Sequence, residues 1–162
     1  MYAYDPSEWS DLFVAAAGAS AALAGLLFVA ISINLERIIG EAGLPERGLE
    51  AVAMLVAVLV VSIIGLIPGQ SQGVFGTELF LAAALLAYMV LKPLKGMPKE
   101  PPRFYVAGRW GLRLLGTVPL LVGAASVMIG DGGGLYWVVG GILFATIAGI
   151  VNAWVLLVEI LR

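Results

Sequence analysis

The sequence predicts an all-α integral membrane protein, a bundle of five transmembrane helices with the N-terminus outside and the C-terminus inside. Hydrophobic residues make up 61% of the chain and charged residues 12%, whereas soluble domains contain about 45–50% and about 25%. Five apolar runs of membrane-crossing length are separated by short polar connections. If these runs alternate in direction, all basic residues fall on one side of the membrane, as is typical of cytoplasmic loops.

The first predicted span covers about residues 12–35, which is long enough to cross a bilayer at about 1.5 Å per residue. Ahead of it, Asp5 can cap a helix, Pro6 suits the first helical position, and Glu8 completes a capping box. A cleaved signal peptide is the competing interpretation. It is disfavoured because no basic residue precedes the apolar run and because the run exceeds the usual length of about 7–15 residues.

Glycine and proline punctuate the remaining runs. Gly43 and Pro45 break the helix that precedes the second span, which covers about 50–67, and Pro68 ends that span. The third span covers about 75–91 and leads into a basic loop at 92–111. The fourth span, about 112–130, contains Pro119, which membrane helices tolerate with a kink, and a DGGG turn leads to the fifth, about 135–161. Residues 1–162 therefore read as a single transmembrane domain.

Charge segregation fixes the predicted orientation. With five spans and the basic loop in the cytoplasm, all nine basic residues lie inside: Arg37, Arg47, Lys92, Lys95, Lys99, Arg103, Arg109, Arg113 and Arg162. The outer segments then carry acidic residues alone: Asp5, Glu8, Asp11, Glu78 and Asp131. A four-span arrangement would place basic residues on both sides. The predicted location is the cell (inner) membrane, with the lipid bilayer as first partner.

Six of the basic residues lie in or beside the predicted loop: Lys92, Lys95, Lys99, Arg103, Arg109 and Arg113. These side chains could attract anionic headgroups, at about 1 kcal/mol per residue, or an acidic surface of a partner protein. The plainer interpretation is that they only set the topology. Four prolines between 93 and 102 argue against a continuous helix there and favour a semi-extended strap.

Small residues recur on three predicted helix faces, and such stripes let helix backbones approach closely. The first stripe contains Gly18, Ala22, Gly25, Val29 and Ser32, and it reaches Glu36 one turn later. The second contains Gly116 and Gly123, and the third contains Trp137, Gly141, Ala145, Ala148, Asn152 and Glu159. We interpret all three as helix-packing surfaces, either within one chain or between chains. Three such stripes are more than a loosely packed bundle needs, which favours a homo-oligomer or a partner helix.

Four polar residues are candidate pore-lining or intramembrane groups: Asn34, Glu36, Asn152 and Glu159. Asn152 is the most deeply placed, and its plainer role is a hydrogen bond between helices. Glu36 and Glu159 end two of the stripes and could line a cation vestibule in a ring of subunits. Their plainer roles are pairing with Arg37 and Arg162 or contact with water.

Catalytic and metal-binding patterns are missing from the sequence. The chain contains no cysteine and no histidine, and no GxSxG, HExxH or P-loop motif. No carboxylate pair lies within a predicted span, so acid–base chemistry would fall on interfacial groups. The sequence therefore predicts no enzymatic activity, no cofactor and no metal, and it shows no nucleic-acid footprint.

Two segments carry a resemblance to a known group. SAALAGLLFVAISINLERI at 20–38 and GLIPGQSQ at 65–72 resemble small bacterial multi-pass membrane proteins without an assigned role. Some of those proteins are labelled "modulator of FtsH protease". The resemblance covers the first two spans and implies a basic cytoplasmic surface where a membrane-anchored protease docks.

The predicted function is a non-enzymatic accessory or regulatory membrane protein that acts through helix packing and the basic loop. The alternative is a homo-oligomeric ion channel or transporter, motivated by Asn152, Glu159 and the first stripe. Five spans do not divide into two equal repeats, which counts against an inverted-repeat transporter.

Overall fold

The computed structural model describes residues 3–92 and 103–160, and every regular element in these ranges is helical. The elements are η1 (Pro6–Trp9), α1 (Ser10–Ile33), α2 (Leu35–Gly40), α3 (Leu44–Gly65), α4 (Gln72–Val90), α5 (Arg103–Ile129) and α6 (Leu135–Ile160). Five of them are long and apolar enough to cross a membrane. The prediction of an all-helical chain with five apolar helices is confirmed.

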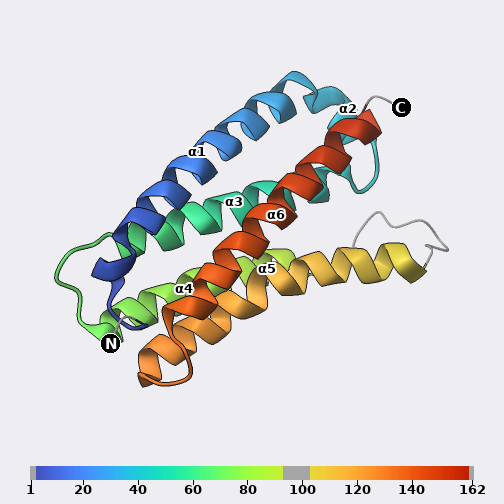
Figure 1. The fold of residues 1–162 in the computed structure, drawn as a ribbon. Helices are drawn as coiled ribbons and strands as arrows, with labels where there is room; N and C mark the ends of the chain where they lie inside the picture. The colour runs from blue at the N-terminus through green and yellow to red at the C-terminus, as the bar shows by residue number, and fades with distance from the viewer. Residues whose placement is uncertain (1–2, 93–102, 161–162) are drawn as a thin grey trace.

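The five long helices run in alternating directions (Figure 1). One end of the bundle collects the N-terminal segment and the α3–α4 and α5–α6 turns. The other collects α2, the end of α4 and the end of α6. We call the second the basic end, because it holds the described basic residues Arg37, Arg47, Lys92, Arg103, Arg109 and Arg113. Lys95, Lys99 and Arg162 lie outside the described residues.

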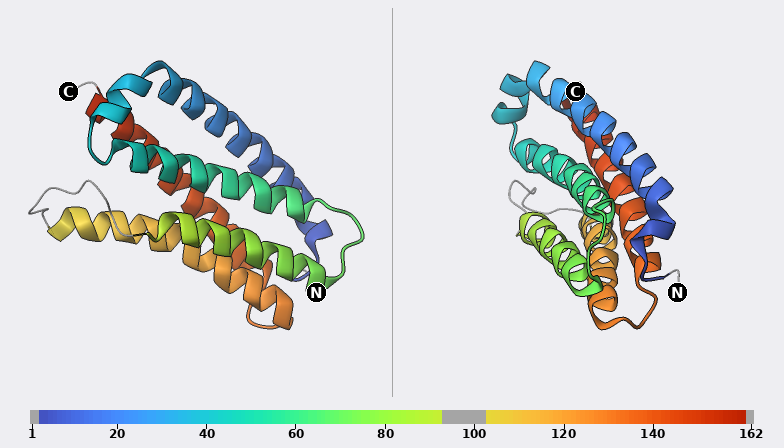
Figure 2. Two further views of the ribbon diagram at one scale, coloured as in Figure 1. Left: turned by 180° about the vertical axis from the view of Figure 1, so that it is seen from behind. Right: turned by 90° about the vertical axis from the view of Figure 1, so that its left-hand side faces the viewer.

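Helices α3, α6, α5 and α4 form a closed ring, and each packs against the next. Their inward side chains make one core that includes Met54, Leu79, Leu120 and Val138. Helix α1 stands outside this ring, against α3 (Figure 2). A second, smaller cluster around Leu27, Leu55 and Leu156 fills the junction of α1, α3 and α6. The bundle is therefore a four-helix core with one peripheral helix.

Glycines and alanines bring α5 and α6 close together. A methyl group at Gly123 would lie 2.7 Å from Val138 Cγ2, and one at Gly141 would lie 2.5 Å from Leu120 Cγ. A methyl group at Gly116 would meet Met54 Sδ at 2.9 Å and Ala145 Cα at 3.3 Å. Ala145 and Ala148 are fully buried. The predicted stripe on α5 and the middle of the stripe on α6 are thus buried within one chain, whereas Trp137 and Glu159 at the two ends of the α6 stripe are exposed.

Two helices begin before the predicted membrane spans that they contain. Helix α3 starts at Leu44 rather than near 50, because Gly43 adopts a positive φ of 88° as its N-cap and Pro45 fits its first turn. Helix α5 starts at Arg103 rather than near 112, so the second half of the predicted loop is helical. Arginine is a good helix former, so a segment rich in arginine is compatible with helix.

The N-terminal segment is tied to the α5–α6 turn. Leu135 N donates to Ala3 O at 2.7 Å, and Gly133 N donates to the Tyr4 hydroxyl at 3.1 Å. Asp5 caps η1 by accepting from the Ser7 hydroxyl and Ser7 N, and these bonds lower the pKa of the Asp5 carboxyl. The predicted cap at Asp5 is present, although it starts a short 3₁₀ turn.

The α5–α6 contact predicts a selective effect of one added methyl group. Gly123→Ala should lower the free energy of unfolding in detergent by about 1–3 kcal/mol, because Val138 leaves no room for it. Gly140→Ala on the same helix pair is the control, since nothing lies within 4 Å of the new methyl group. Denaturation with sodium dodecyl sulfate, followed by tryptophan fluorescence, measures both. Equal stability of the two variants would contradict the close contact.

Candidate functional site

A buried cluster of charged residues lies at the basic end, where side chains of α3 and α5 meet across the four-helix ring. It contains Glu50 on α3 and Arg109 and Arg113 on α5. The exposed fractions of Glu50, Arg109 and Arg113 are 4%, 6% and 3%, so all three side chains are buried. We call these three residues the charge cluster. Arg109 and Arg113 are four residues apart, which places both on one face of α5.

Glu50 accepts from both arginines. Arg109 Nη2 donates to Glu50 Oε1 at 3.0 Å, and Arg113 Nε donates to Glu50 Oε2 at 3.3 Å. Arg113 Nη2 also donates to Glu50 Oε1. The remaining arm of Arg113, Nη1, reaches the carbonyl of Lys92 at 3.1 Å, just beyond the end of α4. The charge cluster therefore joins α3, α5 and the end of α4.

The charge cluster carries one negative and two positive groups, so it has an excess of one positive charge. Arg109 Nε is buried and has no acceptor among the described residues. Arg47, also buried, lies three residues before Glu50 on the same helix. Ionised groups in a low-dielectric site need a partner, and the shared carboxylate supplies it for both α5 arginines. We therefore interpret the charge cluster as a structural ion-pair network that fixes α5 relative to α3 and to the end of α4.

The charge cluster was missed by sequence reasoning. Arg109 and Arg113 were predicted to lie in or beside a surface loop, whereas the structure buries both on α5. Glu50 was not singled out, because it stands at the border of an apolar run. The four-residue spacing of the arginines was the available signal. Once α5 is extended toward Arg103, that spacing predicts a shared helix face and requires an acidic partner.

The other basic residues of the predicted loop have different settings. Lys92 is exposed, and its Nζ lies 4.3 Å from the centre of the Tyr88 ring. Arg103 occupies the first turn of α5. Lys95 and Lys99 fall outside the part of the chain that the structure describes. Among the three predicted surface cations whose side chains are described, Lys92 is exposed, and Arg109 and Arg113 are buried.

The four candidate pore residues are not brought together within one chain. Asn34 Nδ2 donates to the Ala30 carbonyl at 2.9 Å, at the break between α1 and α2. Glu36 is exposed on α2, and Glu159 is exposed near the end of α6. Asn152 is buried in α6, with 3% of its surface exposed. A shared polar lining would require all four to face one passage.

The stripe on α1 is exposed, unlike those on α5 and α6. Gly18, Ala22, Gly25, Val29 and Ser32 all lie on the uncovered side of the helix, and we call them the α1 stripe. No atom lies within 4 Å of a methyl group placed at Gly18 or Gly25. The opposite face of α1, which includes Phe13 and Leu27, packs against the bundle.

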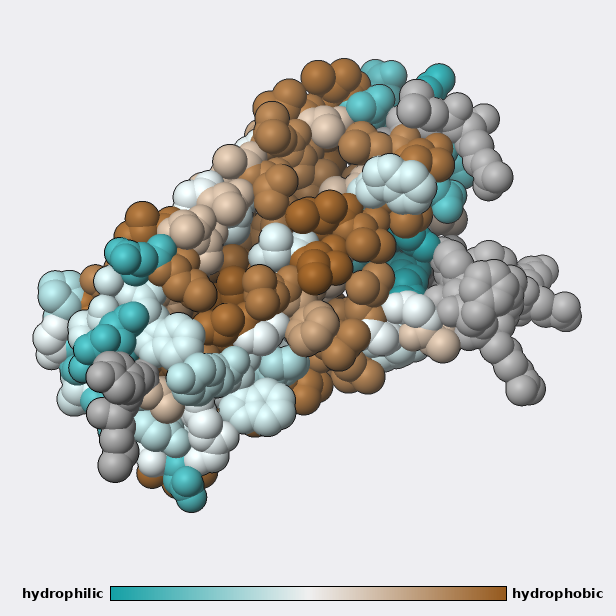
Figure 3. Space-filling model, viewed as in Figure 1, coloured by the Kyte–Doolittle hydropathy of each residue, from teal (hydrophilic) through white to brown (hydrophobic). Residues whose placement is uncertain are grey.

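Hydrophilic residues gather at both ends of the face shown in Figure 3, and hydrophobic residues cover its middle. In the described residues, no three His, Cys, Asp or Glu side chains group so as to hold a metal ion.

Comparison with known proteins finds no matching family model, no matching curated protein and no matching solved structure. The site is therefore interpreted from its own geometry.

The charge cluster predicts a large effect of removing its one carboxylate. Glu50→Gln should lower the free energy of unfolding by about 3–5 kcal/mol, because it leaves two buried arginines uncompensated. Glu41→Gln, at an exposed glutamate near the same end, should change it by less than about 0.5 kcal/mol. The measurement is denaturation of the purified protein in detergent.

A triple variant separates lost pairing from lost packing. Replacing Glu50, Arg109 and Arg113 together by leucine should restore most of the stability that Glu50→Gln removes, because apolar residues of similar volume often match a buried ion cluster. A triple variant that is less stable than Glu50→Gln would show that the charge cluster contributes more than mutual neutralisation.

Proposed function

We propose that this chain is a non-enzymatic accessory protein of the cell membrane, and that it docks a transmembrane helix of another membrane protein on the α1 stripe. The observation that carries the proposal is the contrast between stripes. Methyl groups placed at the stripe glycines of α5 and α6 would meet atoms of neighbouring helices, whereas those at Gly18 and Gly25 on α1 would meet nothing within 4 Å.

Burial supports a docking role for α1. Only 17% of the residues in its most apolar segment are buried, against 61% for α3. Lipid tails are as apolar as leucine, so exposed apolar area alone does not drive helices together in a membrane. Close backbone approach does, through van der Waals contact and weak hydrogen bonds, and small residues make it possible. The α1 stripe offers that approach.

We further propose an orientation with the N-terminus outside and the basic end in the cytoplasm. Basic residues next to transmembrane helices are retained on the cytoplasmic side. In support, Arg37, Arg47 and Lys92 lie at the basic end, and Asp5 and Asp131 lie at the opposite end. Both the N-terminal segment and the α5–α6 turn belong to that opposite end.

The proposed partner is another multi-pass or membrane-anchored protein. A membrane-anchored protease is the first to test, because the segments at 20–38 and 65–72 resemble proteins labelled as modulators of such an enzyme. Most of the α1 stripe lies within the first of these segments. We prefer this role to a channel because, within one chain, only Asn152 of the four candidate pore residues is buried.

The orientation can be tested with single cysteines, because the chain contains none of its own. Asp131→Cys in the α5–α6 turn should react with a membrane-impermeant maleimide in intact cells. Glu41→Cys, after α2, should react only once the membrane is permeabilised. Both positions are exposed, so accessibility within the protein does not differ. The reverse labelling pattern would overturn the orientation.

Docking on the α1 stripe can be tested with a photo-crosslinking side chain at Val29 in native membranes. Gly25→Leu should reduce the crosslinked product about tenfold, since overfilling a close contact costs about 1–3 kcal/mol. Ala19→Leu is the matched control: it adds a leucine to an exposed position of α1 beside the stripe. Mass spectrometry identifies the product.

Three results would overturn the docking proposal. The first is the absence of any protein crosslink at Val29. The second is an equal loss with Gly25→Leu and Ala19→Leu, which would place the contact elsewhere on α1. The third is a product that contains only this chain, which would indicate self-association in place of an accessory role.

A further inference from the structure

We propose that a groove between α3 and α4 binds one acyl chain of an anionic phospholipid, and that Lys92 pairs with the headgroup at the basic end of the groove. This site is separate from the α1 stripe and does not depend on a protein partner. The basic residues were predicted to attract anionic headgroups in general, and the groove gives one such lipid a defined binding site.

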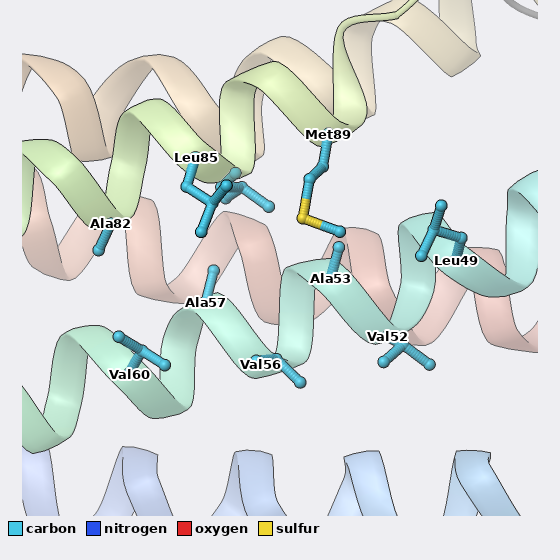
Figure 4. A pocket seen from close by; sticks show the side chains of 10 residues that line it. Leu49, Val52, Ala53, Val56, Ala57, Val60, Ala82, Leu85 and Met89 are labelled. Atoms are coloured by element: carbon cyan, nitrogen blue, oxygen red, sulfur yellow. The ribbon is translucent and has the colours of Figure 1, made fainter.

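The groove is lined by apolar side chains of both helices (Figure 4). Ala53, Ala57 and Leu86 form its floor, and their exposed fractions are 7%, 8% and 2%. Exposed residues form its rims, namely Leu49, Val56, Val60 and Leu85. The groove has a volume of about 170 Å³ and is open to the surroundings along its rims. Alanines in the floor and larger aliphatic side chains at the rims produce a narrow channel.

The length of the groove suits one leaflet. Its lining on α3 runs from Leu49 to Val60, which at about 1.5 Å per residue is about 16 Å. The hydrocarbon core of a bilayer is about 30 Å thick, so one leaflet spans about 15 Å. An acyl chain that enters from the basic end would therefore reach the bilayer midplane within the groove.

The charge at the basic end specifies the headgroup. Leu49 and Met89 line that end of the groove, and Lys92 follows Met89 by three residues. Lys92 is exposed and rests over Tyr88. Two glutamates of α3 lie near Leu49. The carboxylate of Glu50 is occupied by Arg109 and Arg113, and Glu46, one turn before Leu49, is half-buried.

Arg113 also fixes the backbone at Lys92 through its bond to the Lys92 carbonyl. The position from which the lysine side chain starts is therefore set by the charge cluster. The cluster itself adds an excess positive charge behind this position. A phosphodiester that carries net negative charge complements this arrangement. A zwitterionic headgroup brings its own cation and gains less from it.

The test is native mass spectrometry of the purified, delipidated full chain with added phosphatidylglycerol or phosphatidylcholine of identical acyl chains. We expect one tightly bound lipid and a preference for phosphatidylglycerol. Lys92→Gln should weaken phosphatidylglycerol binding about fivefold, which corresponds to about 1 kcal/mol per basic residue, and leave phosphatidylcholine binding unchanged. Ala57→Leu fills the floor and should weaken the binding of both lipids.

Two matched controls locate the effect. Arg37→Gln removes a basic residue of α2 at the same end, away from the groove. Ala19→Leu adds the same volume as Ala57→Leu to an exposed position of α1. Both should retain wild-type lipid binding. A melting curve for each variant confirms folding, and Lys92→Gln, at an exposed position, keeps the test valid if Ala57→Leu does not fold.

Several results would overturn the inference. Equal binding of the two lipids by the wild-type chain would remove the headgroup preference. An equal effect of Lys92→Gln and Arg37→Gln would reduce it to general surface charge. A lipid-free dimer that is lost in Ala57→Leu would assign the groove to a second copy of the chain. The experiment uses purified protein alone, so failure of partner docking on the α1 stripe leaves its outcome unaffected.

Discussion

The fold depends on one constraint, which is that two arginines on the packed face of α5 require an acceptor inside the bundle. Glu50 meets that requirement and thereby sets how α5 is rotated about its own axis. The same rotation turns Gly116 and Gly123 toward the helices that they approach closely. Through the bond from Arg113 to the Lys92 carbonyl, it also fixes where α4 ends. Helix packing and the position of the surface lysine thus follow from one cluster.

The general architecture could be predicted from the sequence because two strong signals agree. Apolar runs of spanning length and one-sided basic residues both report on the membrane, and neither depends on how the helices face each other. The charge cluster could not be predicted in the same way. Pairing between Glu50 and Arg113 joins residues on different helices, and it depends on rotations that hydropathy does not reveal. Arg109 also counted as a loop signal, although arginine is compatible with helix.

The small-residue stripes show the same limit. Sequence reasoning identified three stripes as packing surfaces without separating contacts within one chain from contacts between chains. The structure separates them: Gly141 approaches Leu120, whereas Gly25 has open space before it. A stripe of glycines permits close approach of any helix, whether that helix belongs to the same chain or to another. The sequence of the stripe therefore does not distinguish contacts within one chain from contacts between chains. Only the arrangement of neighbouring helices distinguishes a filled stripe from an unfilled one.

The position of α1 follows from contacts at its two ends. Phe13 sits against Gly65, where a methyl group would lie 2.6 Å from its ring, and Ile31 sits against Gly48 with a corresponding distance of 3.4 Å. Both glycines belong to α3, so α1 contacts the same helix near both of its ends. In water, its remaining apolar surface would be driven onto the bundle. In a bilayer that force is absent, and shape-specific contacts alone decide which face stays open. An exposed stripe of small residues is thus compatible with a stable fold, and its fixed position is what a docking surface requires.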